Sequence, residues 1–390
     1  MTAAPSSAVR DFAIPIALGC VACGGAAIGL AFPLLAYNLD DWGVSEAGIG
    51  LFTLASAFST VVATPFIPAL LARFSIRTVL AAALSMTALA FMGYFAFQSP
   101  SAWFGFRFLA GVALSMLFVS CEAWALDRAS PAKRGLVMGL FASTFAGAMA
   151  LGGGIVALVG YDGFAPFAIG SLISLAGLFL LTLPGRTPPS PEGASASPKA
   201  LWARIKAAPL VMAAPFAMGA IETAKYNLIP IYARRVGFPD ELGAAMITAA
   251  GLGVLMLQPL LGLMADRFGV KRSLAFCAAA GAVLPLLIAG FGTAEGPVLA
   301  GVFAYSGLVT GLYTIGIVWL ARRFSGATLA SGNAAFALCY GLGQMLGPAG
   351  AGAAFTAFGP IGFMAGLSAV AALYLALLAC FLAFGGARSA

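Results

Sequence analysis

The sequence predicts an all-α membrane protein of twelve transmembrane helices, arranged as two six-helix bundles. Of its 390 residues, 62% are hydrophobic and only 8% are charged, whereas about a quarter of the residues of a soluble domain are charged. Apolar runs of roughly 20 residues, the length that crosses a bilayer as a helix, recur along the whole chain. One hydrophilic stretch near the middle separates six runs from six others.

Each apolar run is expected to form one membrane-spanning helix. The runs are too long, and alternate too little between polar and apolar residues, for the strands of a barrel. The first run continues to about Leu39, which exceeds the apolar core of a cleaved signal peptide. The predicted spans are 12–38, 45–72, 76–98, 101–126, 133–160, 163–183, 208–235, 240–266, 270–293, 296–322, 327–357 and 360–385.

The charges between the spans predict the orientation. When alternate loops are assigned to opposite sides, 16 of the 20 basic residues fall on one side. The positive-inside rule makes this side the cytoplasm of a bacterium and places both termini there, in a multi-pass protein of the inner membrane. Arg234 and Arg235 go against the trend. The outer loops hold the acidic residues Asp40, Asp41, Glu46, Asp162, Asp240, Glu241 and Glu295.

The hydrophilic stretch at residues 184–209, "PGRTPPSPEGASASPKALWARIKAAP", predicts a flexible cytoplasmic linker. It is expected to end in a short interfacial helix around Trp202–Ile205. The predicted domains are an N-terminal bundle at 1–184, the linker at 185–207 and a C-terminal bundle at 208–390.

The two halves carry weak internal repeats. "PALLARFSIRTVL" (68–80) matches "LLGLMADRFGVKRSL" (260–274), and "LDRASPAKRGLVMGLF" (126–141) matches "LARRFSGATLASGNAAF" (320–336) in position. Such repeats are typical of transporters in which one half rocks against the other around a site at the membrane midplane.

One short loop carries a specific motif. "GLMADRFGVKR" (262–272) fits the pattern Gly-x-x-x-Asp-Arg-x-Gly-x-Lys/Arg-Lys/Arg, so the chain resembles the major facilitator superfamily. Gly262 is expected to allow close helix approach, Gly269 to permit a tight turn, and Asp266 to accept hydrogen bonds at a neighbouring helix N-terminus. The first-half copy has Ala72 where the acid should stand.

The resemblance implies a twelve-helix transporter whose cytoplasmic loop acts as a latch for the outward-open state. The basic residues of the loop are expected in the anionic headgroup zone or paired with its aspartate. The predicted cytoplasmic gate comprises Gly262, Asp266, Arg267, Gly269, Lys271, Arg272, Asp127, Arg128 and Arg134.

Further stretches sharpen the resemblance. "CEAWALDRASPAKRG" (121–135) and "YGLGQMLGP" (340–348) are similar to runs of the YcaD-like branch, some of whose relatives are linked to metal or vitamin uptake. "RFLAGVALS" (107–115) resembles the fourth-helix signature, which implies a role for Arg107 in proton coupling. The alternative is that Arg107 extends to the outer headgroups.

Glu222 and Lys225 stand near the middle of the seventh span, three residues apart. A charge at this depth indicates a functional residue, and the Lys225 ammonium is expected to form an ion pair with the Glu222 carboxylate. Glu222 then takes up a proton and releases Lys225 to a substrate anion, or Glu222 titrates alone. The third alternative is a static pair that fixes helix packing. Tyr226 and Asn227 extend the polar patch, and Pro230 allows a bend.

Other polar residues are weaker candidates. Glu122, in the cytoplasmic third of the fourth helix, is a second proton site or a structural ion-pair partner. Amide and hydroxyl side chains within the spans are expected either to contact the substrate or to form hydrogen bonds between helices. The cavity candidates are Tyr226, Asn227, Gln258, Asn333, Tyr340 and Gln344.

Metal and cofactor chemistry is not expected. The chain has no histidine, and all six cysteines fall within spans. Cys20 and Cys23 form a CxxC that could bind a soft metal, but helix packing is the preferred interpretation. The methionines of the seventh and eighth spans are not spaced as a ligand array, so we predict no metal.

These observations predict a secondary active transporter that works by alternating access, because no ATP-binding loop is present. A proton gradient is the expected driving force, with Glu222 as first carrier and Glu122 as second. Efflux of an amphipathic organic compound is slightly favoured over import of an anionic nutrient, vitamin or metal complex. A non-transporting sensor is a remote alternative, and no enzyme is expected. The expected partners are a small-molecule substrate and the bilayer, with no nucleic acid, in a monomer.

Overall fold

Helices account for nearly all of the chain that the structure describes. The structure, a computed structural model, describes residues 12–130, 134–185, 198–324 and 326–385, and these contain no strand. The elements are α1 (Ala13–Asp41), α2 (Glu46–Ala63), the 3-10 turn η1 (Thr64–Phe66), α3 (Ile67–Arg73), α4 (Ile76–Ala96), α5 (Pro100–Arg128), α6 (Arg134–Val159), α7 (Ala165–Leu180), α8 (Pro198–Ala207), α9 (Pro209–Val236), α10 (Asp240–Phe268), α11 (Val270–Gly290), α12 (Glu295–Val309), α13 (Gly311–Arg323) and α14 (Gly326–Gly385).

The helices agree with twelve membrane spans. In the described residues, nine helices are long and apolar enough to cross a membrane, and α9 joins them as one arm of a bent pair with α8. The long α14 contains two spans, because Gly359 adopts φ of 67° and breaks the helix before Pro360. The apolar α7 has 16 residues and supplies the remaining span. The predicted fold class is therefore confirmed.

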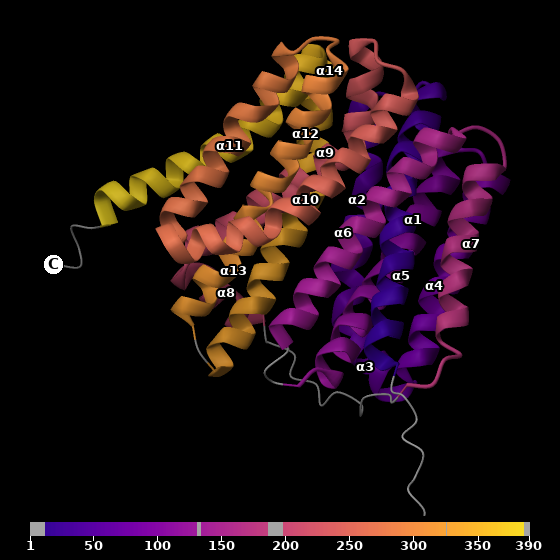
Figure 1. Cartoon of the computed structure of the whole chain (residues 1–390), viewed down its shortest axis with the longest axis horizontal. Helices are drawn as coiled ribbons and strands as arrows, with labels where there is room; N and C mark the ends of the chain where they lie inside the picture. The colour runs from indigo at the N-terminus through magenta and orange to yellow at the C-terminus, as the bar shows by residue number, and fades with distance from the viewer. Residues whose placement is uncertain (1–11, 131–133, 186–197, 325, 386–390) are drawn as a thin grey trace, which may run out of the picture.

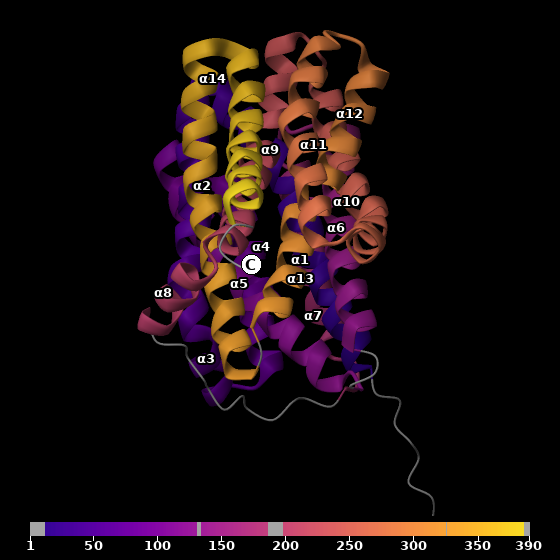
Figure 2. The same cartoon turned by 90° about the vertical axis from the view of Figure 1, so that its left-hand side faces the viewer.

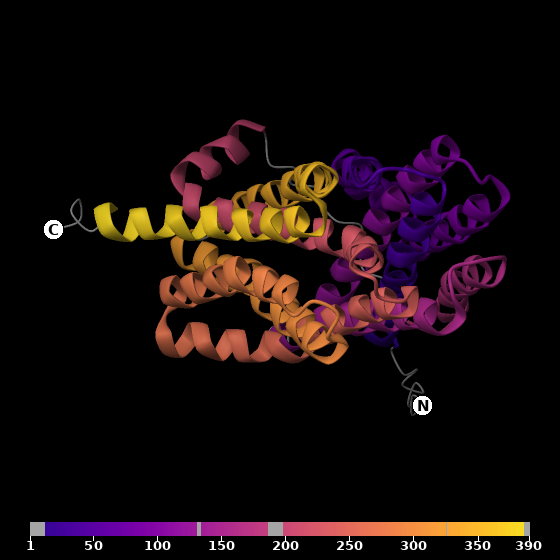
Figure 3. The ribbon, with the colours of Figure 1, turned by 90° about the horizontal axis from the view of Figure 1, so that it is seen from above.

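The helices form two groups that stand side by side (Figures 1 and 3). We call α1–α7 the N-half and α9–α14 the C-half. The turn end carries the α1–α2 turn, the α9–α10 turn and the break at Gly359, at the top of Figure 1. The opposite end, which carries the α3–α4 turn at the bottom of Figure 1 and also the α10–α11 turn, is called the linker end.

Local sequence explains where the helices begin and end. Ser45, Ser75 and Ser99 each accept a hydrogen bond from the backbone N–H three residues on, which caps α2, α4 and α5. Gly237 and Gly269 end α9 and α10 with φ of 97° and 84°, a conformation that costs glycine little. The tight turn expected at Gly269 is thus present.

The short helix predicted around Trp202–Ile205 is present as α8, at lower left in Figure 2. It meets α9 at an angle of 105° and packs Leu201 and Ile205 against the linker end of the C-half. Trp202 is exposed. The part of the predicted flexible linker at residues 186–197 lies outside the described residues.

Candidate functional site

The two halves are joined at the turn end by ion pairs around Arg234. Its guanidinium donates from Nε and Nη2 to the carboxylate of Asp240 in the same half, at 2.9 and 2.8 Å. Its Nη1 reaches across to Asp40 at 2.8 Å and to Asp41 at 2.6 Å, both on α1. Arg234 therefore binds carboxylates of both halves at once.

Arg235 adds a second set of contacts across the same boundary. It pairs with Asp40 and, at 3.0 Å, with Glu46 on α2. Thr356 of α14 donates to the Glu46 carboxylate at 3.2 Å. We call Asp40, Asp41, Glu46, Tyr161, Arg234, Arg235 and Asp240 the turn-end network.

Tyr161 lies between α6 and α7 and accepts a hydrogen bond from Nη2 of Arg234 at 3.0 Å. Burial, with a further contribution from Asp41, raises the pKa of Tyr161 to about 12. The hydroxyl is therefore protonated at neutral pH, and it adds a third N-half partner for this arginine.

Below the turn-end network, Arg107 of α5 also meets the C-half. Only 4% of this residue is exposed. Its Nη2 donates a long hydrogen bond of 3.5 Å to the Asn227 side chain of α9, and its guanidinium lies 5.8 Å from the Phe32 ring centre. Phe32 stacks on Tyr226 across the boundary, with ring centres 5.2 Å apart. Arg107 is thus buried between the halves, which contradicts the alternative that it extends to the outer headgroups.

Lys225 does not contact Glu222 as predicted. The ammonium is fully buried and has no hydrogen-bond partner among the described residues. It lies 4.1 Å from the Tyr226 ring centre and 6.0 Å from that of Tyr305 on α12. Residues three apart on a helix lie only about 60° apart around its axis, but the contacts differ, because Lys225 lies toward Tyr305 of α12 while Glu222 accepts a hydrogen bond from Tyr340 of α14. The predicted ion pair is wrong for this conformation.

Glu222 has a different partner, the hydroxyl of Tyr340 on α14, which donates to its carboxylate at 2.5 Å. The Tyr340 ring packs edge-on against Tyr313 of α13, with centres 5.2 Å apart. Tyr313 lies within electrostatic range of both Glu222 and Glu122. Glu222 and Glu122 are both half-buried. Tyr340 therefore links the Glu222 carboxylate to the ring of Tyr313.

Sequence reasoning missed Tyr313 and Phe32, because an aromatic residue inside an apolar span carries no distinguishing signal. The turn-end network did leave a signal. Arg234 and Arg235 break the positive-inside trend, and acids occupy the outer loops.

The remaining cavity candidates do not gather at one point. Gln258 of α10 accepts a hydrogen bond from Thr314 of α13 at 2.7 Å, which is the helix-joining role. Gln344 is half-buried on α14, whereas Asn333 of the same helix is exposed.

The predicted cytoplasmic gate is loosely held. Asp266 lies 3.7 Å from Arg322, and their side chains are 77% and 54% exposed. The predicted placement of Asp266 at a neighbouring helix N-terminus is therefore not seen. A Cβ at Gly262 would meet nothing within 4 Å, so the expected close approach there is wrong. Asp127 pairs with the adjacent Arg128 at 2.7 Å, and the side chain of Arg134 lies outside the described residues.

Cross-half contacts are therefore unequal along the molecule. Within the described residues, the hydrogen bonds and ion pairs between the halves lie toward the turn end, and they include Arg107 to Asn227 and Thr248 to the Ala150 carbonyl. At the linker end, Arg77 donates to a carbonyl of its own half, and Arg323 donates to the Ala207 carbonyl of α8. The molecule is closed at the turn end.

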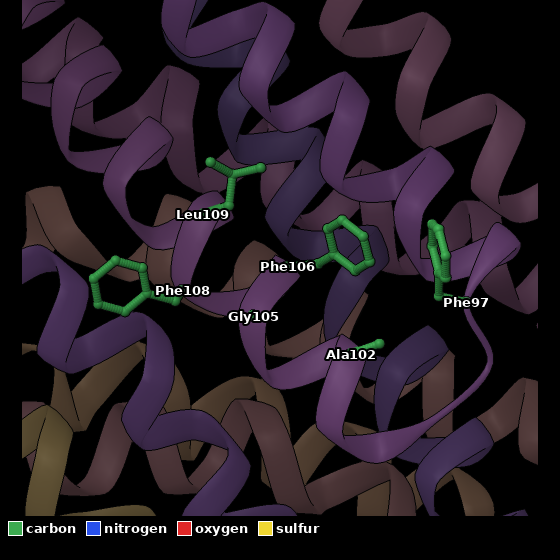
Figure 4. Close-up of a pocket in the computed structure, with 6 residues that line it drawn as sticks. All are labelled: Phe97, Ala102, Gly105, Phe106, Phe108 and Leu109. Carbon is green, nitrogen blue, oxygen red and sulfur yellow. The ribbon is translucent and has the colours of Figure 1, made fainter.

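An apolar hollow of about 440 Å³ on the N-half is not part of this site (Figure 4). It is lined by Phe97, Ala102, Gly105, Phe106, Phe108 and Leu109, none of which has a polar side chain. In the described residues no group of three or more His, Cys, Asp or Glu side chains could hold a metal ion. Cys20 is buried, with its thiol 3.9 Å from the Gly177 carbonyl.

Comparison with known families decides the class of the protein. The model of the Major Facilitator Superfamily matches residues 17–247 and 227–385. The chain belongs to this superfamily. This major facilitator chain is therefore a multi-pass membrane protein of a transporter family.

Relatives and solved structures agree. The chain is 26% identical over 337 residues to the uncharacterized transporter YfkF of Bacillus subtilis (strain 168), covering 85% of this chain and 86% of that protein. It is 24% identical to the uncharacterized transporter YcaD of Escherichia coli O7:K1, over 63% of each chain. The nucleoside transporter NupG superposes with a TM-score of 0.76 at 16% identity, over 95% of this chain and 98% of that one. A bacterial homologue of human Spinster, inward-facing and unoccupied, gives 0.70 at 15% identity, over 96% of each chain. These two likenesses show the fold.

Proposed function

We propose that this protein is a secondary active transporter of the bacterial inner membrane that moves a small molecule by alternating access. The linker end, with both termini, faces the cytoplasm. The observation that carries this proposal is the unequal distribution of hydrogen bonds and ion pairs between the halves: those between described residues lie toward the turn end and include two arginines with three carboxylates. The structure then corresponds to the inward-facing state of the cycle.

The outward-facing state requires these contacts to separate. Arg234 and Arg235 leave their α1 and α2 carboxylates, Phe32 unstacks from Tyr226, and Arg107 leaves Asn227. In exchange, the loop at 262–272 closes on the N-half at the cytoplasmic side. The exposure of Asp266 is consistent with a latch that is released in the present state.

A proton gradient drives the cycle, with Glu222 as the first carrier. Its carboxylate is half-buried at mid-helix and accepts from Tyr340, so a proton on Glu222 changes which of the two groups can donate. Glu122 is the second carrier, and Tyr313, which packs against Tyr340, is near enough to feel the charge of both carboxylates. No cofactor, enzymatic step or second chain is needed, although a sensor that binds without transport is a remote alternative.

Efflux of an amphipathic organic compound is one candidate direction. A second candidate, uptake of an anion, is favoured by one observation. Arg107 and Lys225 are at least nine-tenths buried, and neither forms an ion pair with a carboxylate within the described residues. Opening of the turn end would uncover Arg107 to an anion from outside. A thermal-stability screen of the purified protein separates the two, because lipophilic cations should stabilise an exporter and carboxylates or phosphates an importer.

The test of coupling uses the best ligand from that screen in proteoliposomes. We expect Glu222→Gln to retain exchange of labelled for unlabelled ligand but to lose acceleration by a pH gradient. Glu122→Gln is the matched variant and should lose less. Unchanged dependence on the pH gradient in Glu222→Gln would overturn proton coupling at this residue, and binding without exchange in the wild type would indicate a sensor.

A further inference from the structure

One aromatic stack crosses the boundary between the two halves. Phe32 of α1 and Tyr226 of α9 have ring centres 5.2 Å apart and ring planes that are only 12° from parallel. Both residues are buried, with 7% and 2% of their surfaces exposed. Because alternating access, as proposed above, separates the halves at the turn end, the two rings part in the outward-facing state. Each ring then presents a flat face to whatever enters between them.

A buried cation lies over each ring of the stack. The guanidinium of Arg107 lies 5.8 Å from the Phe32 ring centre, and the ammonium of Lys225 lies 4.1 Å from the Tyr226 ring centre. Within the described residues, neither cation forms an ion pair with a carboxylate. A buried charge without a counter-charge is costly. An anion that binds beside the stack is therefore stabilised by both cations.

Donor groups around the stack also lack partners. Nε of Arg107, Nζ of Lys225 and the Tyr226 hydroxyl have no hydrogen-bond partner among the described residues, and all three residues are at least nine-tenths buried. Nη2 of Arg107 has only its long bond of 3.5 Å to Asn227. Glu222 is near enough to act on the charge of Lys225, but its carboxylate accepts from a tyrosine of α14. Unpartnered buried donors are uncommon in proteins and indicate where an acceptor can bind.

We propose that the ligand of this place is a planar aromatic carboxylate. Its ring binds between Phe32 and Tyr226 once they part, and its carboxylate binds the Arg107 guanidinium. Two parallel N–H groups of a guanidinium match the two oxygens of a carboxylate, and aromatic faces favour a stacked ring. Lys225 adds positive charge from beside the Tyr226 ring. Among the anions considered for uptake, this selects a flat aromatic acid over an aliphatic one.

The experiment measures binding to the purified full-length protein in detergent, followed by the midpoint of thermal unfolding. Benzoate is compared with cyclohexanecarboxylate, which has the charge but no planar ring, and with benzamide, which has the ring but no charge. We expect benzoate to bind at least tenfold tighter than either, because each competitor loses one of the two interactions. Benzoate that does not bind, or that binds no tighter than cyclohexanecarboxylate, overturns the inference.

Two substitutions separate the ring from the charge. Phe32→Leu should abolish the preference for benzoate over cyclohexanecarboxylate, and Arg107→Gln should abolish the preference over benzamide. The matched controls are Phe276→Leu on α11, where the residue is 51% exposed, and Lys206→Gln on α8, and each should change either preference less than twofold. Each preference is a ratio measured on one variant, so a partial loss of folded protein does not imitate the effect. If Phe32→Leu and Arg107→Gln keep both preferences, the ligand binds elsewhere and the inference is wrong.

A transport assay distinguishes this inference from the cycle on which it rests. In proteoliposomes, labelled benzoate should exchange for unlabelled benzoate. Exchange of another ligand with benzoate inert would overturn the aromatic carboxylate and leave the transporter standing. Binding of benzoate with both preferences but without exchange would instead overturn the proposed transport, and the assignment of the ligand would remain.

Discussion

The turn end and the linker end contain the same kinds of charged residue but use them differently. At the turn end, Asp40 has a side chain only 7% exposed and contacts two arginines from the opposite half. At the linker end, Asp266 is 77% exposed and meets one arginine of its own half at 3.7 Å. The first arrangement joins the halves, and the second does not.

This difference teaches that the burial of a charge, and the number of partners it contacts, decide whether charged residues join the two halves. The number of charges at each end decides less. An exposed ion pair contributes about 0–1 kcal/mol and is screened by salt, whereas partly buried charges in a network are screened less. By the positive-inside trend, the linker end is the richer in basic residues. Its one ion pair with Asp266 nevertheless lies within one half, whereas two arginines join both halves at the opposite end.

The largest effect is expected from Arg234→Gln combined with Arg235→Gln. The double variant removes all four cross-half ion pairs of the turn-end network. At roughly 0.5 kcal/mol per pair, the closed state should lose about 2 kcal/mol, which is a shift of about 30-fold in the equilibrium between states. Spin labels at the exposed positions Asp162 and Glu241 measure the separation of the halves at the turn end.

The matched control is Lys206→Gln, which removes an exposed cation at the linker end that lies over the Trp202 ring of its own helix. It should leave the distance distribution unchanged. If the double arginine variant also leaves it unchanged, the ion pairs do not hold the turn end closed, and the comparison between the two ends loses its basis.

The helices and their order could be predicted because each has a local cause. Apolar length determines the spans, and Ser, Pro and Gly mark their ends, so the predicted runs agree with α1–α14 to within a few residues at most boundaries. The break within α14 was also predictable from Gly359 and Pro360. The short helix expected around Trp202–Ile205, at the end of the hydrophilic linker, is likewise present as α8.

A second variant tests packing in place of charge. A Cβ on Gly50 of α2 would overlap the Pro348 carbonyl oxygen of α14, across the boundary between the halves. Gly50→Ala should therefore cost the closed state about 1.4 kcal/mol, or tenfold, because backbone cannot yield as a flexible side chain does. The same spin labels report it.

Gly262→Ala is the matched substitution at the linker end, where an added Cβ meets open space. It should change neither the label distances nor the midpoint of thermal unfolding. An equal response of the two variants would mean that the turn end is no more tightly packed than the linker end.

The site was less predictable than the fold, since its contacts depend on which faces of distant helices meet. Sequence spacing placed Lys225 beside Glu222, but the carboxylate is held by Tyr340, 118 residues away. The position of Arg107 beside Asn227 and Phe32 likewise depends on how the halves pack. No rule based on neighbouring residues predicts contacts between distant helices. A basic residue that breaks the positive-inside trend, as Arg234 does, nevertheless indicates that an acidic partner lies nearby.

A smaller effect is expected from Tyr161→Phe, which removes one neutral partner of Arg234. The closed state should lose about 1 kcal/mol, a factor of about five. Because the pKa of Tyr161 is raised to about 12, its contribution is complete below the ordinary tyrosine value of about 10. It is lost as the pH rises through about 12. Label distances in the wild type should change over this window, and the change should be absent in Tyr161→Phe.

The smallest effect is expected from Asp266→Asn at the linker end. Its one ion pair, with Arg322, is exposed on both sides, so the variant should change the closed-to-open ratio at the turn end by less than twofold. In 1 M salt the wild type and the variant should coincide, because the Debye length falls to about 3 Å. The turn-end labels measured at low and high salt check this. A shift as large as that of the double arginine variant would show that Asp266 already acts as a latch in this state, and that the linker end is held as firmly as the turn end.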